Sequence, residues 1–108
     1  MGFFGDSKQE KELKALMLRA SETMRRLVDE VNTKQLVTPY ARTCINQLGN
    51  EVNMLYEQSV NLSSAKQMSI QVVIDGQPVS FANGKIGLVL FIKDFERRTG
   101  EKFPLKYN

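Results

Sequence analysis

The 108-residue sequence contains no histidine and no tryptophan, and it has a single cysteine. Histidine is the most common general base and metal ligand near neutral pH, so its absence removes every catalytic site built on imidazole. One cysteine without histidine also excludes the usual zinc sites and any internal disulfide. We therefore expect a non-enzymatic protein with no catalytic residues, no metal and no cofactor, which works in the reducing cytoplasm.

The residues with reactive side chains that remain are better explained by structure than by catalysis. Cys44 falls within a predicted helix, where a free thiol is most often a small buried apolar residue. The neighbouring carboxylates stand among basic residues on predicted solvent-facing surfaces, as expected for solvated charge. These carboxylate pairs are Glu10/Glu12, Asp29/Glu30 and Asp94/Glu96.

The chain also lacks a long hydrophobic run. Its longest, Leu88–Ile92, is far too short to span a membrane, for which about 20 residues are needed. The length fits a single domain, residues 1–108, made of a helical part (1–64) and a mixed part (65–108).

Residues 1–64 contain two series of apolar residues that recur at alternating spacings of four and three residues. We call each series a seam, because its members would form one stripe along a helix. Each seam predicts a helix, the first from Lys8 to about Val31 and the second from Pro39 to about Leu62. The members of the two seams pair with a constant index sum, which indicates an antiparallel helical hairpin. The seams are Leu13, Met17, Ala20, Met24, Leu27, Val31 and Ala41, Ile45, Leu48, Val52, Leu55, Ser59, Leu62.

Start signals support both helices. The stretch from Ser7 to Glu10 has the spacing of a capping box, in which a serine side chain accepts from the amide three residues later. Thr38 is a suitable N-cap before Pro39, because proline at the first helical position loses no hydrogen bond.

The second part changes to an alternating pattern. Asp75-Gly76 between β-branched residues predicts a two-residue β-hairpin turn that pairs Val72 with Val79. A third helix is expected over residues 84–99 with Asn83 as its N-cap, although a strand competes for Leu88–Ile92.

In residues 102–107, apolar residues alternate with lysine and proline. This pattern predicts a short C-terminal edge strand that contains Phe103, Leu105 and Tyr107. Such a strand could pair with the β-hairpin as the third strand of its sheet. The predicted fold class is therefore α+β: a long antiparallel helical hairpin, a β-hairpin, a third helix and this edge strand.

Several large apolar residues are not used by the seams. The second helix is also poor in charge and rich in Asn and Gln, as interface cores are depleted of charged side chains. We expect a small protein-interaction module of the adaptor, chaperone or inhibitor type that forms a homodimer. Its candidate interaction surface is Phe3, Phe4, Leu18, Tyr40 and Met54.

The alternative is a nucleic-acid-associated accessory protein. The formal net charge is +3, and helices 1 and 3 carry the candidate anion contacts Arg25, Arg26, Lys85, Arg97 and Arg98. Acidic residues flank both arginine pairs, whereas a phosphate-binding surface is normally free of acids. The sequence therefore favours protein binding over nucleic-acid binding.

Overall fold

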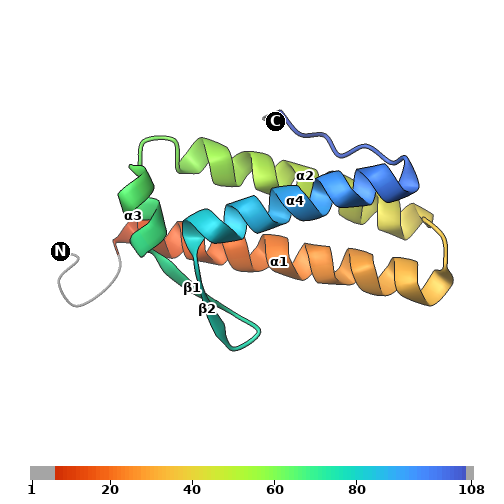
Figure 1. Ribbon diagram of the computed structural model, residues 1–108, viewed down its shortest axis with the longest axis horizontal. Helices are drawn as coiled ribbons and strands as arrows, with labels where there is room; N and C mark the ends of the chain where they lie inside the picture. Colours follow the sequence, from red (N-terminus) through yellow and green to blue (C-terminus); the bar gives the residue numbers. More distant parts are fainter. Residues whose placement is uncertain (1–6, 107–108) are drawn as a thin grey trace.

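The computed structural model describes residues 7–106 of the chain. These residues form an elongated body of 48 × 28 × 17 Å, in which the long helices lie along the longest axis (Figure 1). Phe3, Phe4 and Tyr107, which the sequence analysis singled out, lie outside the described residues.

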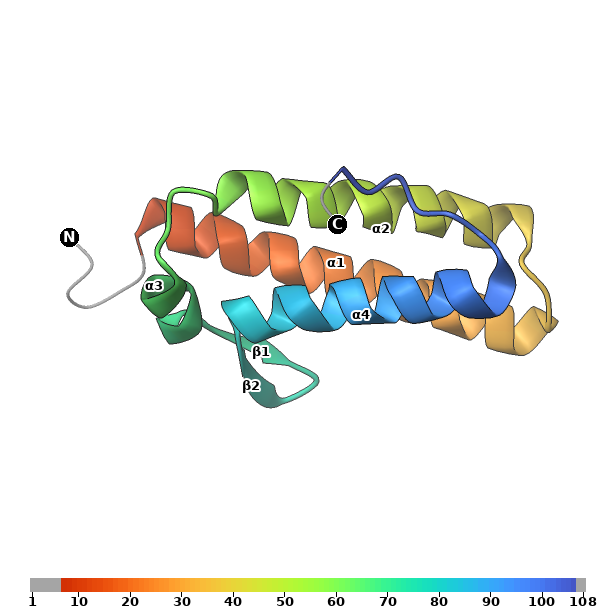
Figure 2. The ribbon, with the colours of Figure 1, turned by 45° about the horizontal axis from the view of Figure 1, so that its top comes forward.

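The predicted helical hairpin is confirmed. Helices α1 (Lys8–Lys34) and α2 (Pro39–Gln58) run antiparallel and side by side (Figures 1 and 2). The Ser7 hydroxyl accepts a hydrogen bond from the Glu10 amide at 3.2 Å, and the Thr38 hydroxyl accepts one from the Ala41 amide at 3.0 Å. Both caps satisfy amides that a helix start otherwise leaves unpaired.

The two seams are the centre of the core. Most of their members are buried, while Met24, Val31 and Leu62 are partly buried at its margin. Ser59, the single polar member, is fully buried, and its hydroxyl donates to the Leu55 carbonyl at 2.6 Å.

Helix α2 ends at Gln58, four residues before the predicted end, and a short helix α3 (Ser64–Ser69) follows. The Ser63 hydroxyl starts α3 by accepting from the Lys66 amide at 3.1 Å. The sequence pattern did not predict α3, which begins at this additional N-cap.

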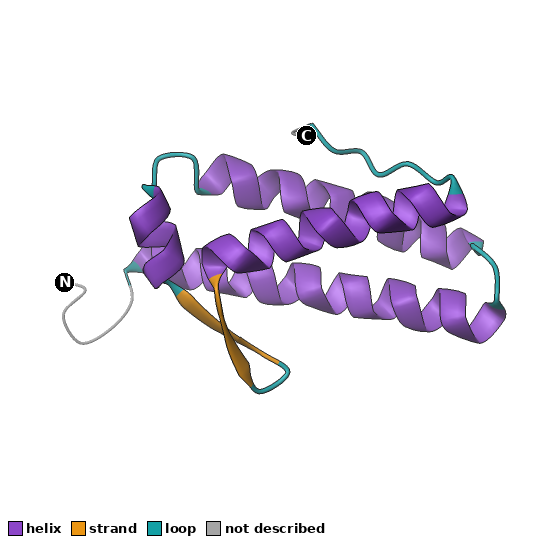
Figure 3. Cartoon of the chain, viewed as in Figure 1, coloured by secondary structure: helices purple, strands orange, loops and turns teal. Residues whose placement is uncertain are grey.

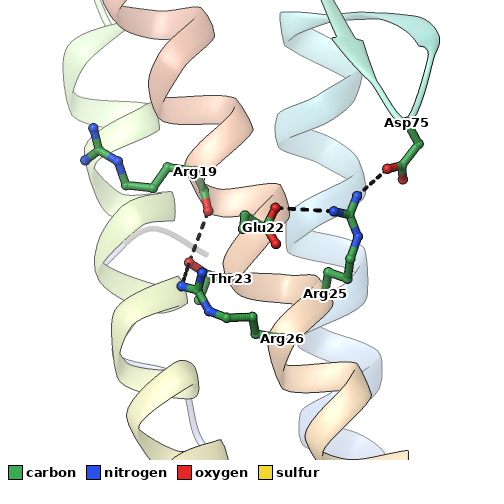
Figure 4. Close-up of polar contacts among 6 residues, drawn as sticks. All are labelled: Arg19, Glu22, Thr23, Arg25, Arg26 and Asp75. Atoms are coloured by element: carbon green, nitrogen blue, oxygen red, sulfur yellow. Dashed lines mark hydrogen bonds and ion pairs between the residues drawn. The ribbon is translucent and has the colours of Figure 1, made fainter.

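The β-hairpin has the predicted register. Strands β1 (Gln71–Ile74) and β2 (Gln77–Ser80) pair Val72 with Val79, and Asp75 and Gly76 both have positive φ (Figure 3). The turn also contacts the helical layer, because the Asp75 carboxylate accepts from the Arg25 guanidinium of α1 (Figure 4).

Helix α4 (Phe81–Thr99) includes the ambiguous stretch Leu88–Ile92, which is helical. It begins three residues earlier than predicted, because Ser80 and not Asn83 is the N-cap: the Ser80 hydroxyl accepts from the Asn83 amide at 3.1 Å. It packs against both α1 and α2 (Figure 2). Gly100, with a φ of 78°, ends the helix.

The predicted C-terminal edge strand is wrong. The sheet of the described residues contains only β1 and β2, and residues 101–106 run instead along α2 as an extended segment (Figure 2). Side chains of the helices take the hydrogen bonds that a strand would have made: Asn53 binds the Pro104 carbonyl and the Lys106 amide.

Candidate functional site

The helical hairpin has one covered face and one open face. Helix α4 packs against the first face, whereas two shallow grooves on the other face are lined only by α1, α2 and the turn after α2. We call this second surface the open face. Its larger groove, of about 700 Å³, is lined by Gln9, Glu12, Ala15, Leu16, Arg19, Met54, Glu57, Gln58, Val60 and Asn61. The smaller groove, of about 240 Å³, is lined by Arg26, Asp29, Glu30, Thr33 and Tyr40.

A buried polar cluster lies between the two grooves. Thr23 is one helical turn from both Arg19 and Arg26 and is fully buried. The Gln47 amide nitrogen Nε2 donates to the Thr23 hydroxyl at 3.1 Å and to Glu51 Oε2 at 3.0 Å. The cluster therefore joins α1 to α2 beneath the middle of the open face.

The cluster is incompletely satisfied. Glu51 is only 5% exposed, and within residues 7–106 its second carboxylate oxygen, Oε1, has no hydrogen-bond partner. A buried acceptor left unpaired costs about 1–3 kcal/mol, and more when it is charged. The carboxylate of Glu51 therefore lies beneath the open face and is not presented on it.

Two arginines flank the cluster. Arg26 Nη2 donates to the Thr23 hydroxyl at 3.4 Å, while the guanidinium of Arg19 makes no ion pair or side-chain hydrogen bond to any residue from 7 to 106. Figure 4 shows both side chains on the α2 side of α1, and Arg25 on the opposite side toward the hairpin. The open face therefore combines cationic groups with a buried carboxylate.

The structure brings two of the candidate interaction residues onto this face. Tyr40 lines the smaller groove and is 48% exposed, and Met54 lines the larger groove and is 37% exposed. Leu18 is equally exposed, but it lies two helical turns before Arg25 and so shares the hairpin side of α1. The sequence grouped these three residues, and the fold separates Leu18 from the others.

The candidate anion contacts do not form one surface. Arg25 pairs with Glu22 at 3.3 Å and with Asp75 at the hairpin turn. Arg97 and Arg98 both pair with Asp94 at the far end of α4. The hydrogen bond from Arg97 is the main reason why the pKa of Asp94 is lowered from its usual value.

Lys85, the fifth candidate anion contact, is buried. Its Nζ donates to the Ser59 hydroxyl at 3.1 Å and lies over the rings of Tyr56 and Phe81. Burial lowers the pKa of Lys85 and raises the pKa of Tyr56. Lys85 therefore serves the core, where the sequence pattern had placed it at an exposed helix start.

The Ser59–Lys85 pair has the composition of a serine–lysine catalytic dyad but not its chemistry. A general base must accept the serine proton, whereas here the Ser59 hydroxyl donates to Leu55 and accepts from Lys85. Ser59 is fully buried, and neither residue lines a groove of the open face. The sequence indicated only one member of this pair, because Ser59 is the single polar residue in the second seam.

Other classes of site have no support among residues 7–106. No group of three or more Asp, Glu or Cys side chains there is placed to hold a metal ion. No helix in this part of the chain has the length and apolarity that crossing a membrane requires. Cys44 is buried, as the sequence indicated.

Comparisons with known proteins give no match. No protein-family model, no curated protein and no solved structure is significantly similar to this chain. The open face and the contacts around it are consequently the basis on which a function is proposed.

Proposed function

We propose that this chain is a non-enzymatic, cytoplasmic protein-interaction module that forms a homodimer through its open face. The observation that carries the proposal is the exposure of two large side chains, Tyr40 and Met54, which line the two grooves of the open face. A partner that covers this face removes the aromatic and thioether surfaces from water.

The charges of α2 support an interface on this face. Helix α2 has three charged residues, and two of them form ion pairs with the C-terminal segment: Arg42 with Glu101 and Glu57 with Lys106. The third, Glu51, is buried. A helix with only three charged residues that keeps an exposed aromatic residue and an exposed methionine has a composition typical of a protein interface.

The charges of α1 support a second copy as the partner. Arg19 lines the larger groove and Asp29 lines the smaller one. When a second copy is turned by 180° so that the two α1 helices run antiparallel with Met24 at the centre, Arg19 of each copy is brought to the position of Asp29 on the other. A surface that complements itself after such a rotation is what a two-fold dimer requires.

The test is the mass of the protein in solution. Light scattering coupled to gel filtration at tens of micromolar is expected to give twice the 12.3 kDa of one chain. Met54→Glu and Tyr40→Glu place charge at the interface, so each variant is expected to be monomeric with an unchanged circular dichroism spectrum.

Leu90→Glu is the matched control. Leu90 is 63% exposed but lies on α4, away from the open face, so its variant should remain dimeric. A monomeric wild-type protein would refute the homodimer, and a dimer that only Leu90→Glu dissociates would place the interface on α4.

The nucleic-acid alternative has less support. It needs the guanidinium groups of Arg25, Arg97 and Arg98, which are engaged with Asp75 and Asp94. Retention on DNA or RNA that falls steeply between low and moderate salt would favour it over the interaction module.

A further inference from the structure

The C-terminal segment is held on the helices in the way that a binding site holds an extended peptide. Residues 101–106 follow the α4 terminus back along α2 (Figure 2). The Asn53 side chain, 4% exposed, donates from Nδ2 to the Pro104 carbonyl at 2.7 Å and accepts at Oδ1 from the Lys106 amide at 2.8 Å. One buried amide thus satisfies a donor and an acceptor of the peptide backbone.

Gly49 provides the contact surface for the proline of the segment. A Cβ atom on Gly49 would clash with Pro104 Cδ and lie 2.8 Å from Pro104 Cγ, so the proline ring packs directly on the backbone of α2. Glycine in a helix interior costs about 1 kcal/mol relative to alanine, and this close approach is a physical reason for its presence.

A phenylalanine precedes the proline and is buried. The Phe103 ring meets Phe95 of α4 edge-on, with centroids 5.7 Å apart. Its amide donates to Glu96 Oε2 at 2.8 Å, and Leu105 packs against the margin of the core. We call Gly49, Asn53, Phe95 and Glu96 together the tail site.

The charged contacts at the two ends add little selectivity. Arg42–Glu101 and Lys106–Glu57 have N–O distances of 3.3 and 3.5 Å and are partly exposed. Exposed pairs of this kind contribute about 0–1 kcal/mol. Recognition therefore depends on the backbone, the phenylalanine and the proline.

We propose that the tail site is a peptide-recognition site for extended Phe-Pro-aliphatic segments of a partner protein, and that the chain's own residues 101–106 occupy it as a competitor in cis. The segment lies beyond Gly100, whose positive φ makes the reversal, so it can leave without unwinding α4. The proposal does not rest on the open face, which lies on the other side of α2.

The tether determines how this competition is expected to behave. A short flexible connection presents its own segment at an effective concentration of about millimolar. A separate peptide therefore binds the wild-type chain weakly, and weakening the attached tail makes the site available.

The probe is a fluorescent peptide with the sequence of residues 101–106, Glu-Lys-Phe-Pro-Leu-Lys. The full chain carrying Phe103→Ala and Pro104→Ala keeps all four residues of the tail site and weakens only the attached competitor. Fluorescence anisotropy is expected to show at least tenfold tighter binding of the probe to this variant than to the wild-type chain.

Two matched controls test the contacts. Adding Gly49→Leu to the double variant fills the position of the proline ring and should abolish binding. A peptide with alanine at both altered positions should not bind. A double variant that is folded by circular dichroism but does not bind the probe would overturn the proposal.

A second measurement needs no variant. In the wild-type chain, millimolar probe peptide should displace the tail and shift the NMR signals of the Asn53 side-chain amide and the Lys106 amide, and unchanged signals would refute the proposal. A dimer dissociated by Phe103→Ala/Pro104→Ala but not by Met54→Glu would show a second copy's tail as the occupant. That result would overturn the separate partner and also the homodimer through the open face.

Discussion

The Lys85 ammonium lies 4.4 Å from the centroid of the Tyr56 ring and donates its hydrogen bond to Ser59. It joins the first turn of α4 to the end of α2 through a charge that is almost wholly buried. A cation over an aromatic face is attracted by the ring quadrupole, and this attraction offsets part of the cost of burying the charge.

This geometry predicts a pH-dependent stability. Because burial lowers the pKa of Lys85 from 10.5 in the folded chain, the unfolded chain binds more protons between the two pKa values, and the free energy of unfolding rises with pH in that interval. The raised pKa of Tyr56 has the opposite effect above its ordinary value of 10.0, because the unfolded chain then loses its proton first. Urea unfolding at a series of pH values below 10.0 measures the effect of Lys85 before Tyr56 contributes.

Lys85→Met should flatten this rise and leave stability at pH 7 unchanged or about 1 kcal/mol higher, since replacing a buried charge by an apolar side chain of similar volume is often neutral or favourable. Lys102→Met, at an exposed lysine, removes the same charge and should retain the wild-type slope. Equal slopes for the wild type and Lys85→Met would contradict the assignment.

Two glycines in helices should respond differently to alanine. At Gly84 the added Cβ meets the flexible end of Met17, with Cε at 2.8 Å, so Gly84→Ala should be neutral or stabilise by up to about 1 kcal/mol. At Gly49 the added Cβ meets the Pro104 ring, so Gly49→Ala should displace the C-terminal segment and destabilise by about 1–2 kcal/mol. Thermal unfolding measures both, and the reverse order would show that the Pro104 contact is unimportant.

The start of α2 depends on one hydroxyl group. Thr38 accepts from the Ala41 amide and donates to Glu30 Oε2 at 2.7 Å, so it also fastens the connection to the end of α1. Thr38→Ala should destabilise the protein by about 1–2 kcal/mol in denaturant unfolding. Thr43→Ala is the control, because Thr43 is exposed and its hydroxyl donates a hydrogen bond only to the Pro39 carbonyl of the same helix. Equal losses for the two variants would argue against the cap.

At the hairpin turn, backbone conformation should matter more than charge. Asp75 has a φ of 52° and also pairs with Arg25. Asp75→Asn keeps a residue that tolerates positive φ and should change stability by less than about 0.5 kcal/mol. Asp75→Val loses the same charge and puts a β-branched residue at positive φ, so it should cost at least about 1–2 kcal/mol. If Asp75→Asn costs as much as Asp75→Val, the ion pair is the more important contact.

The sequence alone determined the local elements, because their causes are local. Ser7 and Thr38 lie three residues from the amides they bind, and Asp75-Gly76 supplies the positive φ that the turn needs. The periodicity of the two seams likewise predicted which residues of α1 and α2 are buried between the helices, because the spacing of residues along a helix is a local property. The start of α4 was predicted three residues too late, because Ser80 and not Asn83 is its N-cap.

Only the tertiary structure decided the contacts between residues that are far apart in the chain. Phe103 and Leu105 alternate as in a strand, but Gly49 and Asn53 lie 50 residues or so away and provide a better place for Pro104 than a sheet edge does. The burial of Lys85 against Ser59 has the same origin. Helix packing selects which side of each helix is covered, and a single helix's periodicity does not specify what covers it.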